Sequence, residues 1–185
     1  MKLAALRLHW GSELSGLLGI TGPAGSGKTT VGDMLVAAGW HRVKFAGPLK
    51  AMCRAMGMTE DMIEGDLKET PIDWLGGKTP RYVMQTLGTE WGRDMIDPDL
   101  WVRLARREII SHLERGRNVV VDDLRFKNEH KVILDLDGAV LRLEGRGGIG
   151  KHRSEQTLPA HIIFENTGTP DSLREFVEFI FLEES

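Results

Sequence analysis

The sequence has one cysteine, no long apolar run and little net charge, and each shortage excludes a class of protein. Cys53 cannot form an internal disulfide, which fits a reducing compartment, and its neighbours Met52 and Met56 favour a buried apolar position over a catalytic thiol. No apolar run approaches the ~18 residues of a membrane span, and Met1 to Trp10 lacks the apolar core of a signal peptide. The formal net charge of −3 creates no basic field for nucleic acid or anionic membranes. We therefore expect a cytoplasmic protein that binds neither nucleic acid nor membrane.

The most informative stretch is Gly22 to Thr29, which fits the phosphate-loop pattern G-x-x-x-x-G-K-[ST]. Residues 17–20 before it read as a buried strand and residues 30–38 after it as a helix, so a chance glycine-rich turn is the weaker explanation. Lys28 is expected to reach the β- and γ-phosphates of ATP, and the Thr29 hydroxyl to bind Mg²⁺. The residues predicted to hold ATP in this stretch are Gly22, Gly25, Ser26, Gly27, Lys28, Thr29 and Thr30.

A second informative stretch is the helix expected over residues 79–96. At about 100° per residue, one face is apolar and the other is polar or glycine. The apolar face carries Val83, Leu87, Trp91 and Met95, and the opposite face carries Arg81, Gln85, Gly88, Thr89 and Gly92, with Arg93 at its edge. Two glycines inside a helix suggest that a ligand approaches the backbone closely, which favours substrate binding. Tight helix packing and a solvated polar face are the alternatives.

Residues 118–123 read as a buried parallel strand that closes on two carboxylates, Asp122 and Asp123. Ligands of open α/β sheets lie beyond the carboxyl ends of the strands, so both carboxylates and Arg125 are expected near the phosphate loop. Asp122 is the predicted second magnesium ligand. Asp123 could instead cap the following helix, and Arg125 and Glu129 could form only a surface ion pair.

The chain after the next strand, expected over residues 139–144, is rich in glycine and cations. Residues 145–158 are predicted to form a lid that closes on phosphates, with Arg146 and Arg153 as catalytic cations, although a solvated basic loop is the alternative. The last strand is expected over residues 161–166, and a final helix follows it.

The alternation of strands and helices predicts a three-layer α/β/α fold around a parallel sheet of about five strands. We expect an N-terminal extension over residues 1–16 and a single domain over residues 17–185. Residues 47–97 are expected to form a helical substrate-binding region within that domain. The mixed sequence of residues 58–78 suggests a surface segment without a core of its own.

Four ordered motifs, together with the phosphate loop, resemble the deoxynucleoside monophosphate kinases of tailed bacteriophages. The motifs lie at residues 45–50, 87–93, 98–102 and 121–129. The resemblance implies phosphoryl transfer from ATP, with Mg²⁺, to deoxynucleoside monophosphates. It also implies that the acceptor is bound by Arg81, Gln85, Gly88, Thr89, Trp101, Asp123, Arg125 and Glu129, and we add Arg93 as a candidate for the acceptor phosphate. Relatives often have Asp where this chain has Thr29, so the metal environment can differ.

A second resemblance keeps another substrate open. Residues 152–155 and Asn166 are similar to positions in dephospho-coenzyme A kinases and in the animal type of phosphomevalonate kinase, where the segment after the last strand lies near adenine. Asn166 is therefore predicted to bind ATP. A kinase for another phosphorylated acceptor and a nucleotide-dependent switch are the alternative functions. The expected partners are ATP and a deoxynucleoside monophosphate, a homodimer is one assembly that the sequence allows, and a phage-encoded enzyme would work in the host cytoplasm.

Overall fold

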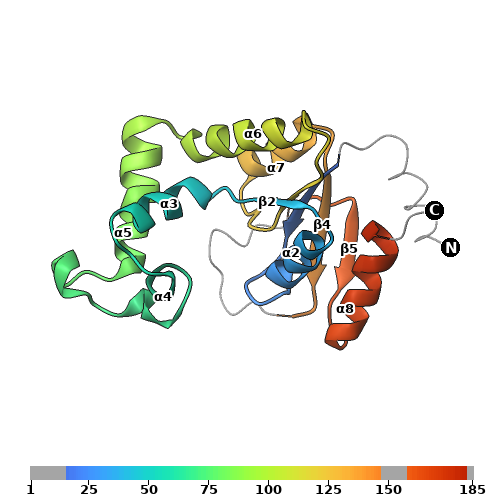
Figure 1. Ribbon diagram of the computed structural model, residues 1–185, viewed down its shortest axis with the longest axis horizontal. Coiled ribbons are helices and arrows are strands. Elements are labelled where there is room, and N and C mark those ends of the chain that lie inside the picture. Colours follow the sequence, from blue (N-terminus) through green and yellow to red (C-terminus); the bar gives the residue numbers. More distant parts are fainter. Residues whose placement is uncertain (1–15, 147–157, 183–185) are drawn as a thin grey trace. The chain divides into compact units, whose positions relative to one another are not determined.

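The computed structural model describes residues 16–146 and 158–182, and its centre is a five-stranded parallel sheet (Figure 1). The strand order is β2-β3-β1-β4-β5, so the strand that precedes the phosphate loop is central. The strands are β1 (Leu17–Thr21), β2 (His41–Val43), β3 (Val119–Val121), β4 (Ala139–Glu144) and β5 (Ile162–Glu165). Leu17 pairs with Val119, and Leu18 pairs with Ala139, which fixes the register on both sides of β1.

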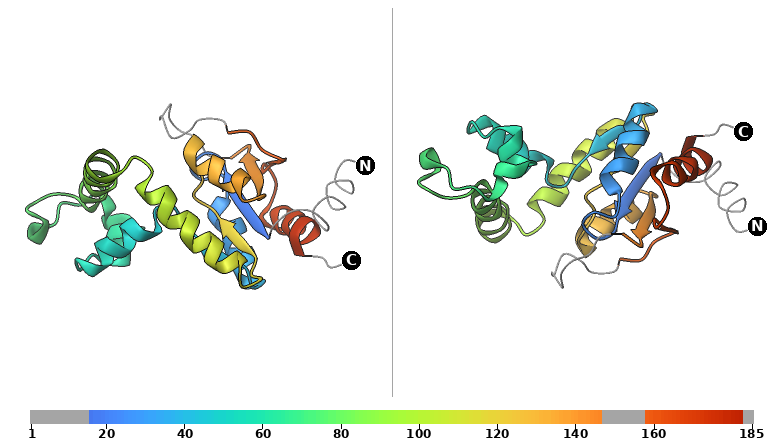
Figure 2. Two further views of the ribbon diagram at one scale, coloured as in Figure 1. Left: turned by 90° about the horizontal axis from the view of Figure 1, so that it is seen from above. Right: turned by 90° about the horizontal axis from the view of Figure 1, so that it is seen from below.

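Helices cover both faces of this sheet, which confirms the predicted three-layer α/β/α fold (Figure 2). α2 (Lys28–Ala37) and α8 (Pro170–Val177) pack on one face, where the apolar side chains of the sheet form the main core. α7 (Lys127–Asp135) packs on the other face. Gly19 of β1 faces α7, and a Cβ atom there would lie 3.0 Å from the Ile133 side chain, so a larger residue would separate the two layers.

Apolar residues of the two helices on the first side pack into the core. The pattern of residues 30–38 predicts an apolar stripe of Val31, Leu35 and Val36, and the first two are fully buried whereas Val36 is exposed. The pattern of the last helix predicts four inward residues, and all are buried, namely Leu173, Phe176, Val177 and Ile180. This helix continues as a short π-helix, Glu178–Leu182.

A second compact unit, Phe45–Ala105, is entirely helical (Figure 1, teal to light green). It contains α3 (Gly47–Ala55), α4 (Glu60–Ile63), α5 (Pro80–Thr86) and a π-helix (Leu87–Ile96), with short 3₁₀ turns at Asp66–Glu69 and Asp73–Leu75. α6 (Leu100–Leu113) begins in this unit, and the boundary falls inside it. We call Phe45–Ala105 the helical unit and the remainder of the chain the sheet unit.

The helical unit has its own apolar cluster, which the sequence did not lead us to expect. Cys53, Met58, Ile63 and Met84 are buried together, and Val83 and Leu87 pack against them. Burial of Cys53 agrees with the sequence-based expectation, and desolvation raises the pKa of its thiol, which disfavours the reactive thiolate. Residues 58–78 therefore contribute core side chains despite their polar composition.

Within the described ranges, no helix has both the length and the apolar character needed to cross a bilayer.

Candidate functional site: the phosphate loop and its surroundings

The phosphate loop runs from the end of β1 to the start of α2, as its sequence predicts. Gly22 and Gly27 have φ angles of 143° and 102°, a region that side chains other than hydrogen resist. A Cβ atom at Gly22 would clash with the carbonyl oxygen of Leu143, and one at Gly27 would lie 2.8 Å from the amide nitrogen of Asn166. The glycines therefore allow the loop to lie directly against the neighbouring strands β4 and β5.

The Lys28 ammonium is held over the loop that precedes it. Its Nζ donates hydrogen bonds to the carbonyl oxygens of Gly22 at 2.7 Å and Pro23 at 2.6 Å. The side chain is largely buried, whereas Thr29 and Thr30 are exposed at the start of α2. A helix N-terminus with a fixed cation and exposed hydroxyls has the chemistry to bind an anion such as a polyphosphate.

Asn166, which was expected near adenine, lies against the backbone of the phosphate loop. Its side chain is buried, and Nδ2 donates to the carbonyl oxygen of Ser26 at 2.9 Å. The Ser26 hydroxyl is also buried and has no hydrogen-bond partner among the described residues. Asn166, just after β5, therefore stabilises the conformation of the phosphate loop, a role that the sequence pattern alone could not reveal.

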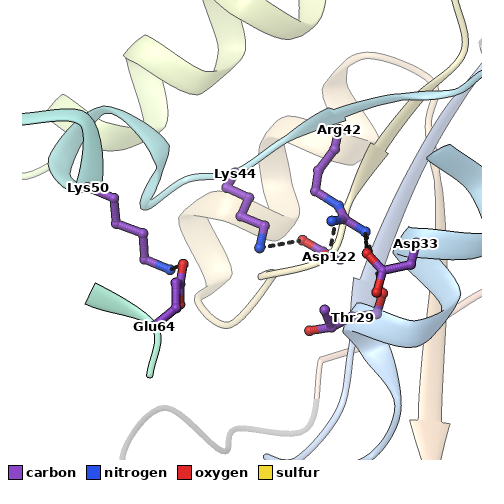
Figure 3. Close-up of polar contacts among 7 residues, drawn as sticks. All are labelled: Thr29, Asp33, Arg42, Lys44, Lys50, Glu64 and Asp122. Atoms are coloured by element: carbon purple, nitrogen blue, oxygen red, sulfur yellow. Dashed lines mark hydrogen bonds and ion pairs between the residues drawn. The ribbon is translucent and has the colours of Figure 1, made fainter. Parts of the chain in front are cut away.

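Asp122 lies at the carboxyl end of β3, but its side chain is only 1% exposed and is surrounded by cations (Figure 3). Arg42 Nε is 3.2 Å from Asp122 Oδ2, and Lys44 Nζ is 3.7 Å from Oδ1. Neither contact is a hydrogen bond, and the Lys44 contact is too long for one. Burial raises the pKa of Asp122, and the nearby Lys44 and Arg42 charges oppose that effect. The carboxylate thus faces two protein cations instead of an open metal position.

Arg42 and Lys44 are residues that the sequence analysis did not select. The Arg42 guanidinium also donates to Asp33 Oδ1 at 2.8 Å and to the carbonyl oxygen of Thr29 at 3.4 Å. It therefore joins β2, the end of β3 and the first turns of α2. The sequence carried only a weak signal for them, namely two cations that alternate with apolar residues within residues 42–45. Figure 3 also shows Lys50 paired with Glu64, both inside the helical unit.

Glu129, a predicted acceptor residue, caps its own helix. Its Oε2 accepts hydrogen bonds from the backbone N–H groups of Arg125 at 2.9 Å and Phe126 at 3.0 Å. Helix α7 begins at Lys127, so Asp123 lies too early to be its cap, which excludes that alternative. The Glu129 carboxylate fixes the backbone that carries the exposed Arg125 side chain.

In the helical unit, the predicted helix over residues 79–96 changes geometry halfway. Thr79 caps α5 by accepting from the Tyr82 N–H, and Leu87–Ile96 is a π-helix, with more residues per turn than an α-helix. Because the assumed rotation of 100° per residue no longer holds, the four residues of the predicted apolar face do not share one environment. Val83 and Leu87 pack against the apolar cluster, whereas Trp91 is exposed and Met95 is 75% exposed. The single apolar face predicted from the sequence is therefore wrong beyond Leu87.

Trp101 is buried beneath this π-helix, with 3% of its surface exposed. Its Nε1 donates to the carbonyl oxygen of Gly88 at 2.8 Å. A Cβ atom at Gly92 would lie 2.6 Å from the indole ring. Gly92 therefore accommodates the Trp101 ring, and a Cβ atom at Gly88 would lie 3.2 Å from the Leu49 side chain, so both glycines fit the tight-packing alternative. Because the indole N–H is used internally, Trp101 shapes this surface from beneath and is not positioned to stack on a base.

The polar residues predicted on the same segment lie at its surface. Gln85 and Thr89 are exposed, and Arg93 is partly exposed. Arg81 Nε donates to the exposed carboxylate of Glu69, so this guanidinium has a protein partner that a phosphate would have to replace.

The predicted lid lies almost wholly outside the described residues, and Arg153 with it. Arg146 is described, exposed, and donates from Nη2 to the carbonyl oxygen of Gly168 at 2.5 Å. This contact directs Arg146 toward the turn between β5 and α8, close in sequence to Asn166.

Comparison with known proteins agrees with the chemistry of these residues. A sequence model described as deoxynucleotide monophosphate kinase matches residues 77–177, which is more than half of the chain. A protein of Acanthamoeba polyphaga mimivirus, whose name assigns it to the deoxynucleotide monophosphate kinases, is 35% identical over 160 residues. That match covers 79% of this chain and 80% of the viral protein.

Proposed function

Because the chain belongs to the deoxynucleotide monophosphate kinase family, we propose that it transfers the γ-phosphoryl group of ATP to a deoxynucleoside 5′-monophosphate, giving a deoxynucleoside diphosphate and ADP. The observation that carries the choice of donor is the phosphate loop, with Lys28 held over it and α2 beginning directly behind it. Backbone N–H groups, the helix dipole and one ammonium are the groups that nucleotide-binding loops use for the β- and γ-phosphates.

Two hydrogen-bond systems hold this donor site in shape before a nucleotide binds. Lys28 bridges the carbonyl oxygens of Gly22 and Pro23, and Asn166 holds the carbonyl oxygen of Ser26. Such preorganisation lowers the reorganisation needed when charge develops on the transferring group. Phosphate binding would draw the Lys28 ammonium away from the two carbonyl oxygens toward the β- and γ-oxygens.

The fit of a magnesium ion differs between the two ligands predicted for it. The Thr29 hydroxyl is exposed in the first turn of α2, so its oxygen would be able to hold the metal ion. Asp122 does not fit as a direct ligand, because its oxygens are buried against Arg42 and Lys44. A bound Mg²⁺ would neutralise phosphate charge at the Thr29 side of the site.

We propose the following acceptor-binding residues, taken for each unit by itself. In the helical unit these are Arg81, Gln85, Gly88, Thr89 and Arg93, and in the sheet unit they are Asp123, Arg125 and Glu129. Guanidinium groups suit bidentate contact with a phosphate. The backbone N–H of Arg125 donates to the Glu129 carboxylate, which fixes the position of the Arg125 backbone. Trp101 contributes by shaping the π-helix that carries Gly88 and Thr89.

The reaction needs positioning and charge neutralisation more than acid–base chemistry. A phosphate monoester has a second pKa of about 6, so the acceptor is already largely dianionic at neutral pH. Arg125, Arg146 and Arg153 are candidates to neutralise the transferring group, and loss of such an arginine slows related reactions by about 10³-fold or more.

We further propose that the enzyme works in the cytoplasm, that it binds neither nucleic acid nor membranes, and that its oligomeric state is a homodimer.

A coupled assay for ADP tests this function and its alternatives together. The enzyme is incubated with ATP and Mg²⁺ plus each deoxynucleoside monophosphate, dephospho-coenzyme A, or no acceptor. We expect ADP formation that depends on at least one deoxynucleoside monophosphate. Formation only with dephospho-coenzyme A would identify the other kinase, and formation that is independent of any acceptor would identify a nucleotide-hydrolysing switch.

A further inference from the structure

The ion pairs around Asp122 have no role in the reaction as described above. They join three elements of the sheet unit (Figure 3). Arg42 and Lys44 belong to β2 and the residue after it, Asp33 lies on α2, and Asp122 follows β3, much later in the sequence. Arg42 is only 23% exposed and Lys44 is 27% exposed. A buried carboxylate between two partly buried cations forms a fixed part of the fold, unlike a mobile surface ion pair.

Electrostatics argue against a magnesium ion at the Asp122 carboxylate. Each of its oxygens faces one protein cation, Arg42 at 3.2 Å and Lys44 at 3.7 Å. A divalent cation on either oxygen would therefore lie beside a like charge, which disfavours binding. Magnesium also demands near-octahedral geometry and usually retains several waters, whereas this side chain is 1% exposed.

The packing around Gly32 shows what the carboxylate holds in place. A Cβ atom at this position of α2 would lie 2.6 Å from both Arg42 Nη2 and Asp122 Oδ2. The ion pair therefore lies directly against the helix, one turn after Thr29. From there Arg42 reaches the carbonyl oxygen of Thr29 and the carboxylate of Asp33.

We propose that Asp122 is a buried anchor and not a magnesium ligand, and that it makes Arg42 a positioning residue for the first turns of the phosphate-loop helix. Held by Asp122, Arg42 fixes the helix segment that presents the Thr29 hydroxyl and the loop N–H groups to a nucleotide. This inference rests on the proposed use of the phosphate loop for ATP. It predicts that both residues act on nucleotide affinity whether or not magnesium is present.

The test is titration calorimetry of ADP binding, in EDTA and in Mg²⁺, at a temperature where every variant is folded. For Asp122→Asn and Arg42→Met we expect about tenfold weaker binding in both conditions, because either change releases the first turns of α2 from their charged partners. The dissociation constant in Mg²⁺ divided by that in EDTA stays at its wild-type value. For Thr29→Val we expect this Mg²⁺-to-EDTA ratio to rise, because removal of a metal contact weakens binding only in Mg²⁺.

The matched control is Arg103→Met, which removes an Arg–Asp pair of the same 3.2 Å length at a 70% exposed side chain. We expect its ADP affinity to equal that of the wild type. If Asp122→Asn raises the Mg²⁺-to-EDTA ratio of the dissociation constants and leaves binding in EDTA intact, Asp122 is a metal ligand and the inference is wrong. If Arg42→Met binds ADP like the control, the positioning role is wrong. Failure of the wild type to bind ADP at all would instead refute the proposed ATP site.

Discussion

Single side chains from the C-terminal part of the chain complete the phosphate loop. Asn166 lies 140 positions after Ser26 in the sequence, yet its amide donates to the Ser26 carbonyl oxygen inside the protein. The same amide fills the space beside Gly27 that a Cβ atom would need. One side chain therefore both satisfies a buried backbone acceptor and limits the conformations open to the loop.

Replacement of Asn166 by Leu, which keeps the approximate size and removes the donor, tests this role. The Ser26 carbonyl oxygen would lose its buried partner, which costs about 1–3 kcal/mol. We expect unfolding at lower denaturant concentration and about tenfold weaker ATP binding, since the loop would no longer be held in its binding geometry. Wild-type affinity measured by calorimetry would show that Asn166 is not needed to shape the loop.

At the scale of elements, the helical unit is organised by the contact between the π-helix and Trp101. The indole donates to the Gly88 carbonyl oxygen and occupies the space beside Gly92. The first turn of α6 thus holds the π-helix by one hydrogen bond and by packing of the indole ring.

Replacement of Trp101 by Phe keeps an aromatic ring and removes the N–H donor. We expect the free energy of unfolding to fall by about 0.5–1.5 kcal/mol, the net contribution of a typical hydrogen bond, because this bond is only partly buried. Because Gly88 and Thr89 move with the π-helix, we also expect the KM for the deoxynucleotide to rise while the ATP affinity stays unchanged. Trp74→Phe, at an exposed tryptophan of the same unit, is the control, and equal KM values for the two variants would contradict this role.

The start of α7 provides a second test at this scale. The Glu129 carboxylate accepts two backbone N–H groups, those of Arg125 and Phe126. Glu129→Leu would leave both donors without this partner, and loss of a helix cap costs about 0.5–2 kcal/mol. We expect lower stability in chemical denaturation together with slower turnover, because Arg125 loses its fixed backbone. Unchanged turnover in a destabilised variant would show that Glu129 contributes to stability and not to the active site.

Elements that depend on local sequence could be predicted, and those that depend on distant partners could not. The limits of β4 agree with the expected residues 139–144, and the phosphate loop follows its motif, because both patterns are contained in one stretch of chain. Family membership was also predicted correctly from ordered motifs. The π-helix was missed because a helical period of 3.6 was assumed throughout. The Arg42–Asp122 and Asn166–Ser26 contacts were missed because they require the sheet order and register.

At the scale of the whole molecule, two stacked histidines join the start of β2 to the end of α6. The rings of His41 and His112 lie 4.5 Å apart and nearly parallel. Burial lowers the pKa of His112, and the charges of His41, Arg117 and Arg115 lower it further, against an opposing effect of Glu108. The His112 Nδ1 is buried and has no hydrogen-bond partner among the residues that the structure describes. Protonation of this ring is therefore disfavoured in the folded protein.

This depressed pKa predicts a loss of stability in mild acid. Above pH 6.5 the ring is neutral in both states, so it adds no pH dependence. As the pH falls below 6.5, the unfolded chain takes up a proton that the folded protein resists, and the free energy of unfolding decreases until the folded pKa is passed. His112→Phe keeps a ring for stacking, and denaturant titrations from pH 7.5 to pH 5 should show a flatter profile for it. Identical profiles for wild type and variant would contradict the assignment.

The most direct measurement follows the transferred phosphoryl group itself. ATP labelled at the γ-phosphate is incubated with Mg²⁺, a deoxynucleoside monophosphate and either the wild-type enzyme or Lys28→Met, and the products are separated by chromatography. We predict label in the deoxynucleoside diphosphate with the wild type, and a rate lower by several powers of ten with the variant, because Lys28 is the cation held over the phosphate loop. Label that appears only as inorganic phosphate, or diphosphate formed equally well by Lys28→Met, would contradict the proposed function.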